Sequence, residues 1–331
     1  MDDGLLWMAA GSQKENEMGS QVSCMRIKQW RWAWFCLLFL VVPAHGQSEI
    51  NLNGAIDFHV HSGPDRTPRS IDADDLARLA KQSGMRGLVL KNHYESTAAL
   101  AYMVRKQVPG IEVFGGITMD LSNGGINIDA VKELMAMQGG WGRVVWLPTE
   151  DAENDVKGRK SADPFVPVSK DGHLVPSVLE LIDFIAQHHD LVFETGHISA
   201  EEVLLVTHEA HQRGVTHVVV THAMYYLENM TIPQMQQAAR DGAYLEFDAD
   251  GPMVGPQPRH TMADYAEAIR QVGPQSCILA TNFGTIRKPP VPLHPQGLLD
   301  FMEALHKEGI SVADINLMAK TNPALALGLK P

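Results

Sequence analysis

Residues 55–61 read AIDFHVH, a short apolar run that ends in two histidines. Seven more runs rich in Val, Ile and Leu follow it, and stretches with helical spacing separate them. One such stretch carries Leu76, Leu79 and Ala80 on one helical face, and another opens with the capping box of Ser199 and Glu202. The predicted strands cover residues 55–61, 86–92, 111–118, 143–149, 191–197, 217–223, 243–249 and 277–283.

This alternation of strands and helices determines the predicted fold. Strands that alternate with helices pair in parallel, through right-handed crossovers. Eight such units within residues 47–331 match an α/β protein with a parallel, eight-stranded (β/α)8 TIM barrel. An open doubly wound sheet is the competing arrangement, but no Gly-x-Gly-x-x-Gly sequence follows the first run. Residues 150–176 and 251–260 are predicted loop insertions at the C-terminal face of the barrel, because both follow strand ends.

The N-terminal residues have the organisation of a secretory signal peptide. Three basic residues precede Ala33–Val42, an apolar run that is too short to span a bilayer comfortably. Ala44-His45-Gly46 then supplies a small-x-small cleavage site, although a buried N-terminal helix is the alternative. We predict an extension and signal peptide over 1–46, with the signal at about 25–46, and one barrel domain over 47–331. The product would be secreted or periplasmic, and Met1 or Met25 would be its start.

Composition excludes several classes of protein. The chain has 45% hydrophobic and 20% charged residues, which is typical of a packed globular protein rather than a disordered or multi-span membrane protein. Three cysteines exclude a disulfide scaffold and a cysteine-built zinc site. The net charge of −12 argues against nucleic acid as a partner. We expect a small-molecule substrate and no stable membrane anchor after signal cleavage. Homo-oligomerisation is possible.

Polar residues gather at the carboxyl ends of the predicted strands. Strand alternation points His59 and His61 to the same side, which in a barrel is the interior. Two imidazoles placed in this way can reach one divalent ion. A single His-x-His pair is weak evidence, but the later strand ends repeat the pattern. They carry Lys91 and His93, Glu150, Glu194 and His197, His222, and Asp248 and Asp250.

The pattern resembles the amidohydrolase superfamily of metal-dependent hydrolases, and more narrowly an uncharacterised branch of it, over nearly all of residues 54–330. The likeness rests on Asp-x-His-x-His in the first strand, Lys-x-His in the second, Glu-Thr-Gly-His in the fifth, His in the sixth, and the closing Asn322-Pro323-Ala324. It implies one or two divalent ions, zinc before manganese or iron. Glu194, Glu150 or a carboxylated Lys91 would bridge two ions, although the superfamily's lysine usually lies on strand four. The implied metal-binding residues are His59, His61, Glu194, His197 and His222.

The eighth strand departs from the superfamily pattern, because Asn282 stands where an aspartate is expected. An asparagine amide can coordinate a metal or donate a hydrogen bond, but it cannot accept a proton at neutral pH. Three explanations stay open. Glu194 or His93 acts as the base, the metal-bound hydroxide suffices, or catalysis is weak or lost.

The resemblance predicts a hydrolase in which metal-activated water attacks an ester, lactone, amide or phosphoester bond. His93 or Lys91 would stabilise the oxyanion or protonate the leaving group. A non-catalytic or weakly active metal- or ligand-binding barrel and a metal-dependent isomerase or lyase are the alternatives. The predicted substrate contacts are Arg66 and Arg69, for an anionic group, together with Glu150 and Asp250.

Overall fold

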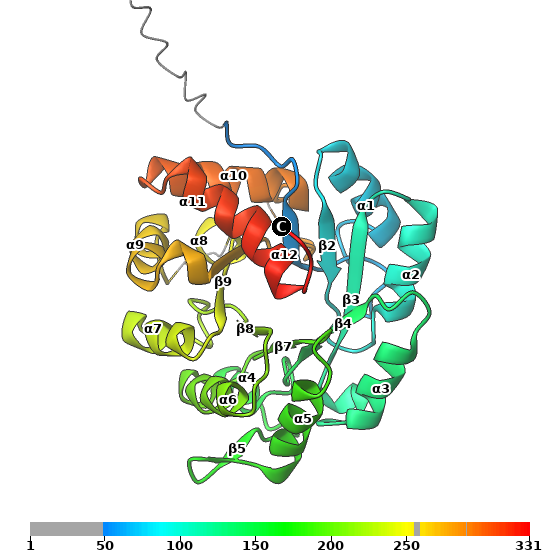
Figure 1. Cartoon of the computed structure of the whole chain (residues 1–331), viewed down its shortest axis with the longest axis vertical. Helices are drawn as coiled ribbons and strands as arrows, with labels where there is room; N and C mark the ends of the chain where they lie inside the picture. The colour runs from blue at the N-terminus through cyan, green and yellow to red at the C-terminus, as the bar shows by residue number, and fades with distance from the viewer. Residues whose placement is uncertain (1–48, 255–258, 289) are drawn as a thin grey trace, which may run out of the picture. The chain divides into compact units, whose positions relative to one another are not determined.

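The computed structural model describes residues 49–254, 259–288 and 290–331 (Figure 1). The predicted signal peptide lies outside the described residues, and so do Cys24 and Cys36. Cys277 is a buried free thiol. Among the described residues no helix is long and apolar enough to cross a membrane.

Eight parallel strands form the barrel in the order β1-β2-β3-β4-β7-β8-β9-β10. The two end strands also meet, since the N–H of His61 donates to the carbonyl of Phe283 at 3.0 Å and that of Asn282 to the carbonyl of His59 at 2.9 Å. The predicted (β/α)8 barrel is therefore confirmed. The strands are β1 (Ile56–Val60), β2 (Gly87–Leu90), β3 (Glu112–Thr118), β4 (Gly142–Trp146), β7 (Val192–Glu194), β8 (Val218–Val220), β9 (Tyr244–Asp248) and β10 (Cys277–Ala280).

Helices surround the sheet on the outside (Figure 1). The capping box predicted at Ser199 is present, because its hydroxyl accepts from the N–H of Glu202 and the Glu202 carboxylate accepts from the N–H of Ser199. The main helices are α1 (Ala73–Gln82), α2 (Ala98–Gln107), α3 (Ile128–Ala136), α5 (Pro176–Ala186), α6 (Ala200–Gln212), α7 (Ile232–Arg240), α9 (Met262–Val272) and α10 (His294–Lys307).

The C-terminal residues close the bottom of the barrel. They form α11 (Val312–Asn316), a π-helical turn (Leu317–Thr321) and α12 (Asn322–Ala326). The side-chain amide of Asn322 donates to the carbonyls of Pro274 and Cys277 at 2.8 and 2.7 Å. Behind it, Ala324, Ala326 and Leu327 pack into the same apolar cluster as the barrel interior. The Asn-Pro-Ala sequence therefore anchors a structural plug.

The inner apolar layer positions the polar residues above it. Alternate residues of a strand face the same side. Val89, Val192, Val219 and Ala280 belong to the interior cluster, so the residues two positions later, among them Lys91 and Glu194, also lie inside the barrel. In β1 a register shift between Asp57 and Val60 interrupts the alternation, and the His59 side chain reaches β9 across the interior.

Both predicted insertions follow strands whose ends carry polar residues. Residues 150–176 contain α4 (Glu153–Gly158) and a two-stranded antiparallel sheet of β5 (Ser169–Lys170) and β6 (His173–Leu174). The second insertion begins within α8 (Asp250–Val254). Short 3-10 turns lie at Leu121–Asn123 and Pro274–Ser276.

Candidate metal centre

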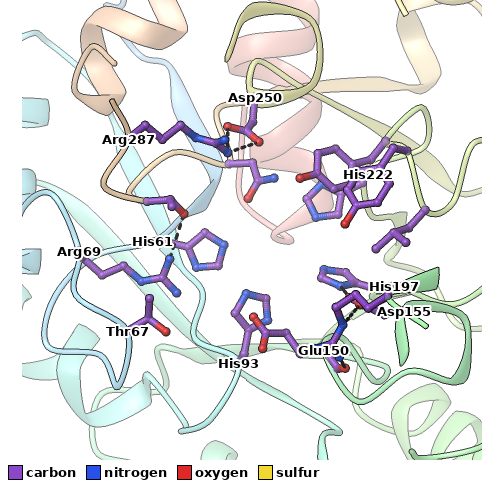
Figure 2. A pocket seen from close by; sticks show the side chains of 16 residues that line it. His61, Thr67, Arg69, His93, Glu150, Asp155, His197, His222, Asp250 and Arg287 are labelled. Atoms are coloured by element: carbon purple, nitrogen blue, oxygen red, sulfur yellow. Dashed lines mark hydrogen bonds and ion pairs between the residues drawn. The ribbon is translucent and has the colours of Figure 1, made fainter. Parts of the chain in front are cut away.

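The five histidines predicted from strand ends form a closed circle of imidazole rings. Neighbouring ring centroids are close together all the way round. They lie 5.1 Å apart for His59 and His61, 5.0 Å for His61 and His93, 5.6 Å for His93 and His197, 5.3 Å for His197 and His222, and 4.7 Å for His222 and His59. All five side chains are buried, and Figure 2 shows four of them around the cavity. We call this group the histidine ring: His59, His61, His93, His197 and His222.

In four of these residues the Nδ1 atom contacts an acceptor oxygen directly. The partners lie on different segments, and a carbonyl or an ionised carboxylate can only accept a proton. Where the partner is a carbonyl or an ionised carboxylate, Nδ1 carries the proton and Nε2 keeps its lone pair. The contacts are His59 to Glu246 at 2.9 Å, His61 to the Lys91 carbonyl at 3.2 Å, His197 to Asp155 at 2.8 Å and His222 to Asp248 at 3.2 Å.

His93 reaches a carboxylate through a hydroxyl. Its Nδ1 lies 2.8 Å from the hydroxyl oxygen of Thr149, and that hydroxyl donates to Asp120. The Asp120 carboxylate also accepts from the backbone N–H groups of Thr149 and Asp151, at 2.8 and 3.0 Å. A hydroxyl has one proton to give, so the Thr149 oxygen accepts from His93. His93 thus presents the same unprotonated Nε2 as the other four histidines.

Burial keeps the histidine ring neutral. It lowers the pKa values of His59, His61, His93 and His222 well below 6.5, and that of His197 to about 4. Neutral imidazole is the form that binds metal ions.

Unpartnered atoms indicate what the site lacks. The Nε2 atoms of His59 and His197 are buried and have no hydrogen-bond partner within the described ranges. Buried polar atoms in proteins are normally paired, so these two nitrogens fit a site built to hold a cation. One potential ligand atom from each of His59, His222 and Glu246 also lies within 4.8 Å of the other two.

Lys91 and Glu194 are fully buried in the barrel interior. The Lys91 ammonium lies 5.5 Å from the centre of the Trp146 ring and has no hydrogen-bond partner in the described part of the chain. One Glu194 oxygen accepts from the Thr221 hydroxyl at 2.9 Å, and the other has no partner among the described residues. Burial raises the pKa of Glu194 to about 7, while the charge of Lys91 opposes this shift. Neither residue is among those that line the cavity at the histidines.

A cavity of about 310 Å³ opens at the histidine ring. The predicted residues Arg69, Glu150, Asp250 and Asn282 line it together with His61, His93, His197 and His222. Arg66 lies outside this wall and stacks over the Tyr94 ring at 4.7 Å. Asp250 is engaged by Arg287, whose Nη2 lies 2.7 and 2.8 Å from its two oxygens.

Several residues of the site were missed from the sequence. Asp120, Asp155 and Glu246 hold three of the rings, and Arg287 lines the cavity. Glu246 lies two residues before the predicted Asp248 on the same strand, so alternation could have found it. Asp155 lies in the short helix α4 of an insertion and Arg287 lies in a loop, and neither segment has a periodic pattern that indicates direction.

Solved structures with the same fold include proteins described as hydrolases. Organophosphorus hydrolase from Deinococcus radiodurans superposes with a TM-score of 0.57 at 14% identity, over 85% of this chain and 97% of that one. An amidohydrolase from Pseudomonas aeruginosa gives 0.54 at 12% identity, over 82% and 95%. The phosphotriesterase homology protein from Escherichia coli, solved with phosphate in its active site, gives 0.51 at 16% identity, over 84% and 99%.

These likenesses establish the fold class of the chain. It has the same barrel fold as these hydrolases, which agrees with the resemblance drawn from the strand-end motifs. The chain belongs to the family of unknown function DUF6282, whose family model matches residues 54–246. None of the curated proteins matches its sequence.

Proposed function

We propose that this protein is a secreted or periplasmic metal-dependent hydrolase of small molecules, with zinc as its ion. The histidine ring carries the proposal, because five neutral imidazoles each keep Nδ1 occupied and Nε2 unprotonated. A catalytic zinc takes three protein ligands and a structural one takes four, so five ligands, namely His59, His61, Glu194, His197 and His222, favour two ions. The compartment rests on residues 25–46 alone.

The residues divide the catalytic work as follows. When bound, a divalent ion polarises the scissile oxygen and acidifies a water molecule. His59, His61, His197 and His222 would hold the ions, with Glu194 as the candidate bridge, and the oxygens on their Nδ1 atoms would fix the ring orientations.

His93 is the proposed proton acceptor in place of the missing aspartate. When its Nε2 takes a proton, the imidazolium still donates from Nδ1 to Thr149, and Thr149 donates to the Asp120 carboxylate. The negative charge at the end of this chain stabilises the protonated ring. His93 lines the cavity, so the proton can pass directly to a leaving group.

Metal analysis of the purified mature protein tests the proposal first. We expect one or two equivalents of zinc per chain, and a loss of at least half of it in His59→Ala. His211→Ala is the matched control, since His211 is exposed on α6 and should leave the metal content unchanged. A chain with no stoichiometric zinc, manganese or iron, or equal metal content in both variants, would end the metal proposal.

A metal-binding barrel without hydrolytic activity is the second candidate, and Asn282 favours it. This residue lines the cavity at the position where the superfamily keeps an aspartate. A panel of ester, lactone, amide and phosphoester substrates separates the two functions. Turnover that is lost together with the metal supports the hydrolase, and full metal occupancy without turnover of any bond type supports the binder.

A further inference from the structure

We propose that the cavity selects small molecules that carry an anionic group, a carboxylate or a phosphate, and binds that group at Arg69 and Arg287. The proposal deepens the proposed hydrolase and rests on it for the kinetic readout. Two segments far apart in the sequence build the binding wall. We call it the donor wall: Thr67 and Arg69 after β1, and Asn282, Thr285 and Arg287 after β10.

Backbone hydrogen bonds join the two halves of the donor wall. The N–H of Ser70 donates to the carbonyl of Gly284 at 2.9 Å, and Arg69 pairs with Thr285 in an antiparallel bridge. The two arginines therefore border one cavity, although 218 positions separate residue 69 from residue 287. Figure 2 shows Arg69 and Thr67 on the side of the cavity opposite His197 and Asp155, with Arg287 above.

Arg69 is held rigidly and keeps hydrogen-bonding capacity. Its side chain is 5% exposed, and its Nε and Nη2 both lie 2.6 Å from one oxygen of the buried Asp65. Its Nη1 donates to the Thr285 hydroxyl at 3.4 Å. A guanidinium has five N–H donors, so at most three are engaged within the described residues and two remain. Fixed, forked donors of this kind suit carboxylate and phosphate oxygens.

Arg287 adds a second guanidinium at the same wall. All its hydrogen bonds to the described residues use Nη2, which contacts both oxygens of Asp250. Its Nε and Nη1 hydrogens stay available to a ligand. Thr67 and Thr285 contribute hydroxyls, and Asn282 contributes an amide. The donor wall thus contains two guanidinium–carboxylate pairs, Arg69 with Asp65 and Arg287 with Asp250, and its free N–H donors are what a ligand anion would meet.

The opposite wall disfavours an anion. It carries two carboxylates, Glu150 and Asp155, against one guanidinium, that of Arg159, which pairs with Asp155 at 2.7 Å. Tyr226 and Leu227 complete that side with aromatic and apolar surface. The hydrogen-bond donors that suit an anion therefore lie on one side of the cavity only. This asymmetry orients a ligand with its anionic end at the donor wall and its neutral end at Tyr226.

The size of the cavity restricts the substrate further. Small-molecule sites span about 300–1,000 Å³, and 310 Å³ lies at the lower limit. Arg69 lines the cavity together with His61 and His93, so the guanidinium faces the same space as the histidine ring. A bound anionic group would thus lie next to the reacting bond, so the substrate class is a short acid or phosphate whose scissile bond is a few atoms from the charge.

A pair of chromogenic esters tests the proposal. Mono-4-nitrophenyl succinate carries a carboxylate, and 4-nitrophenyl acetate does not. We expect wild type to favour the succinyl ester at least tenfold in kcat/KM. That ratio should fall to near one when Asp65→Asn and Arg69→Gln are combined, a change that removes both charges so that no carboxylate is left buried alone.

The control removes a comparable ion pair at the other end of the barrel. Arg86 and Glu112 lie at the start of β2 and β3, 2.7 Å apart, and Arg86→Gln with Glu112→Gln should leave the ester preference unchanged. A wild-type preference below twofold, or one that survives the change at residues 65 and 69, would overturn the proposal.

Calorimetric binding of succinate and inorganic phosphate separates this proposal from the hydrolase. If neither ester is hydrolysed but the chain binds either anion, and the change at residues 65 and 69 weakens that binding tenfold, the hydrolase fails and the anion site stands. Equal binding in wild type and variant would sink the anion site whatever the turnover. The tighter of the two anions identifies the group as carboxylate or phosphate.

Discussion

Asn282 lies two residues after the end of β10, with a backbone φ of +55° in the left-handed region. Most side chains avoid that region, while asparagine and aspartate tolerate it. Its N–H donates to the carbonyl of His59 at 2.9 Å, which ties this conformation to the strand that carries two of the histidines. The backbone at this position would accept the aspartate of the superfamily, so only the side-chain chemistry differs.

Replacing Asn282 by aspartate should therefore add a base without disturbing the fold. We expect Asn282→Asp to retain its metal and to raise any hydrolytic rate about tenfold or more, since general bases contribute about 10²-fold and upward. Steady-state kinetics beside metal analysis of the same preparation checks this. A lower rate at unchanged metal content would show that the asparagine amide itself takes part in the reaction.

The segments that follow β1 and β10 lie in direct contact at Gly284. Its φ is +119°, and a Cβ built there would lie 2.0 Å from the carbonyl oxygen of His61 and 2.7 Å from its carbonyl carbon. No side chain can occupy that space without moving one strand end away from the other. The same contact sets the positions of His61 and the donor wall.

Gly284→Ala should consequently destabilise the protein strongly and weaken metal binding. We expect the free energy of unfolding to fall by about 3 kcal/mol or more, because overpacking adds to backbone strain. Gly309→Ala is the matched control, because Gly309 also has a positive φ, +89°, but has open space around its Cβ position. That control should cost about 1 kcal/mol from backbone strain. Equal urea midpoints for the two variants would rule out the close-approach argument.

Buried neutral histidines make the whole molecule sensitive to acid. Besides the histidine ring, His294 at the start of α10 is fully buried, and burial lowers its pKa to about 4. The unfolded chain protonates this residue near pH 6.5, so between about pH 6.5 and 4 the unfolded state binds more protons. Its contribution to stability is complete above that range and is lost as the pH falls through it.

Urea unfolding at pH 6.5 and 4.5 tests this origin of acid sensitivity. His294→Leu removes the titrating group while leaving the site at residue 294 apolar. Between pH 6.5 and 4.5, the free energy of unfolding of wild type should fall by about 2 kcal/mol more than that of the variant. His211→Ala, an exposed histidine change, should keep the wild-type slope. If the stability of His294→Leu depended on pH as steeply as that of wild type, the acid sensitivity would come from other groups.

The sequence by itself determined the barrel and the five histidines of the candidate site. Strand and helix periodicities are local, so all eight predicted strands overlap observed ones. The carboxyl ends of parallel strands meet at one face, which is why histidines counted along the chain also lie together in space. The capping box at Ser199 was predictable for the same reason, since its hydrogen bonds join residues three positions apart.

The tertiary structure alone decided how those histidines are held and what surrounds them. Asp120 reaches His93 through Thr149, Asp155 reaches His197 from an insertion, and Glu246 reaches His59 across the barrel. These partners come from segments that no sequence period relates, because loop paths and side-chain reach bring them together. The protonation of each imidazole and the distribution of charge around the cavity follow from those contacts. Both therefore depend on the tertiary structure and could not be predicted from the sequence.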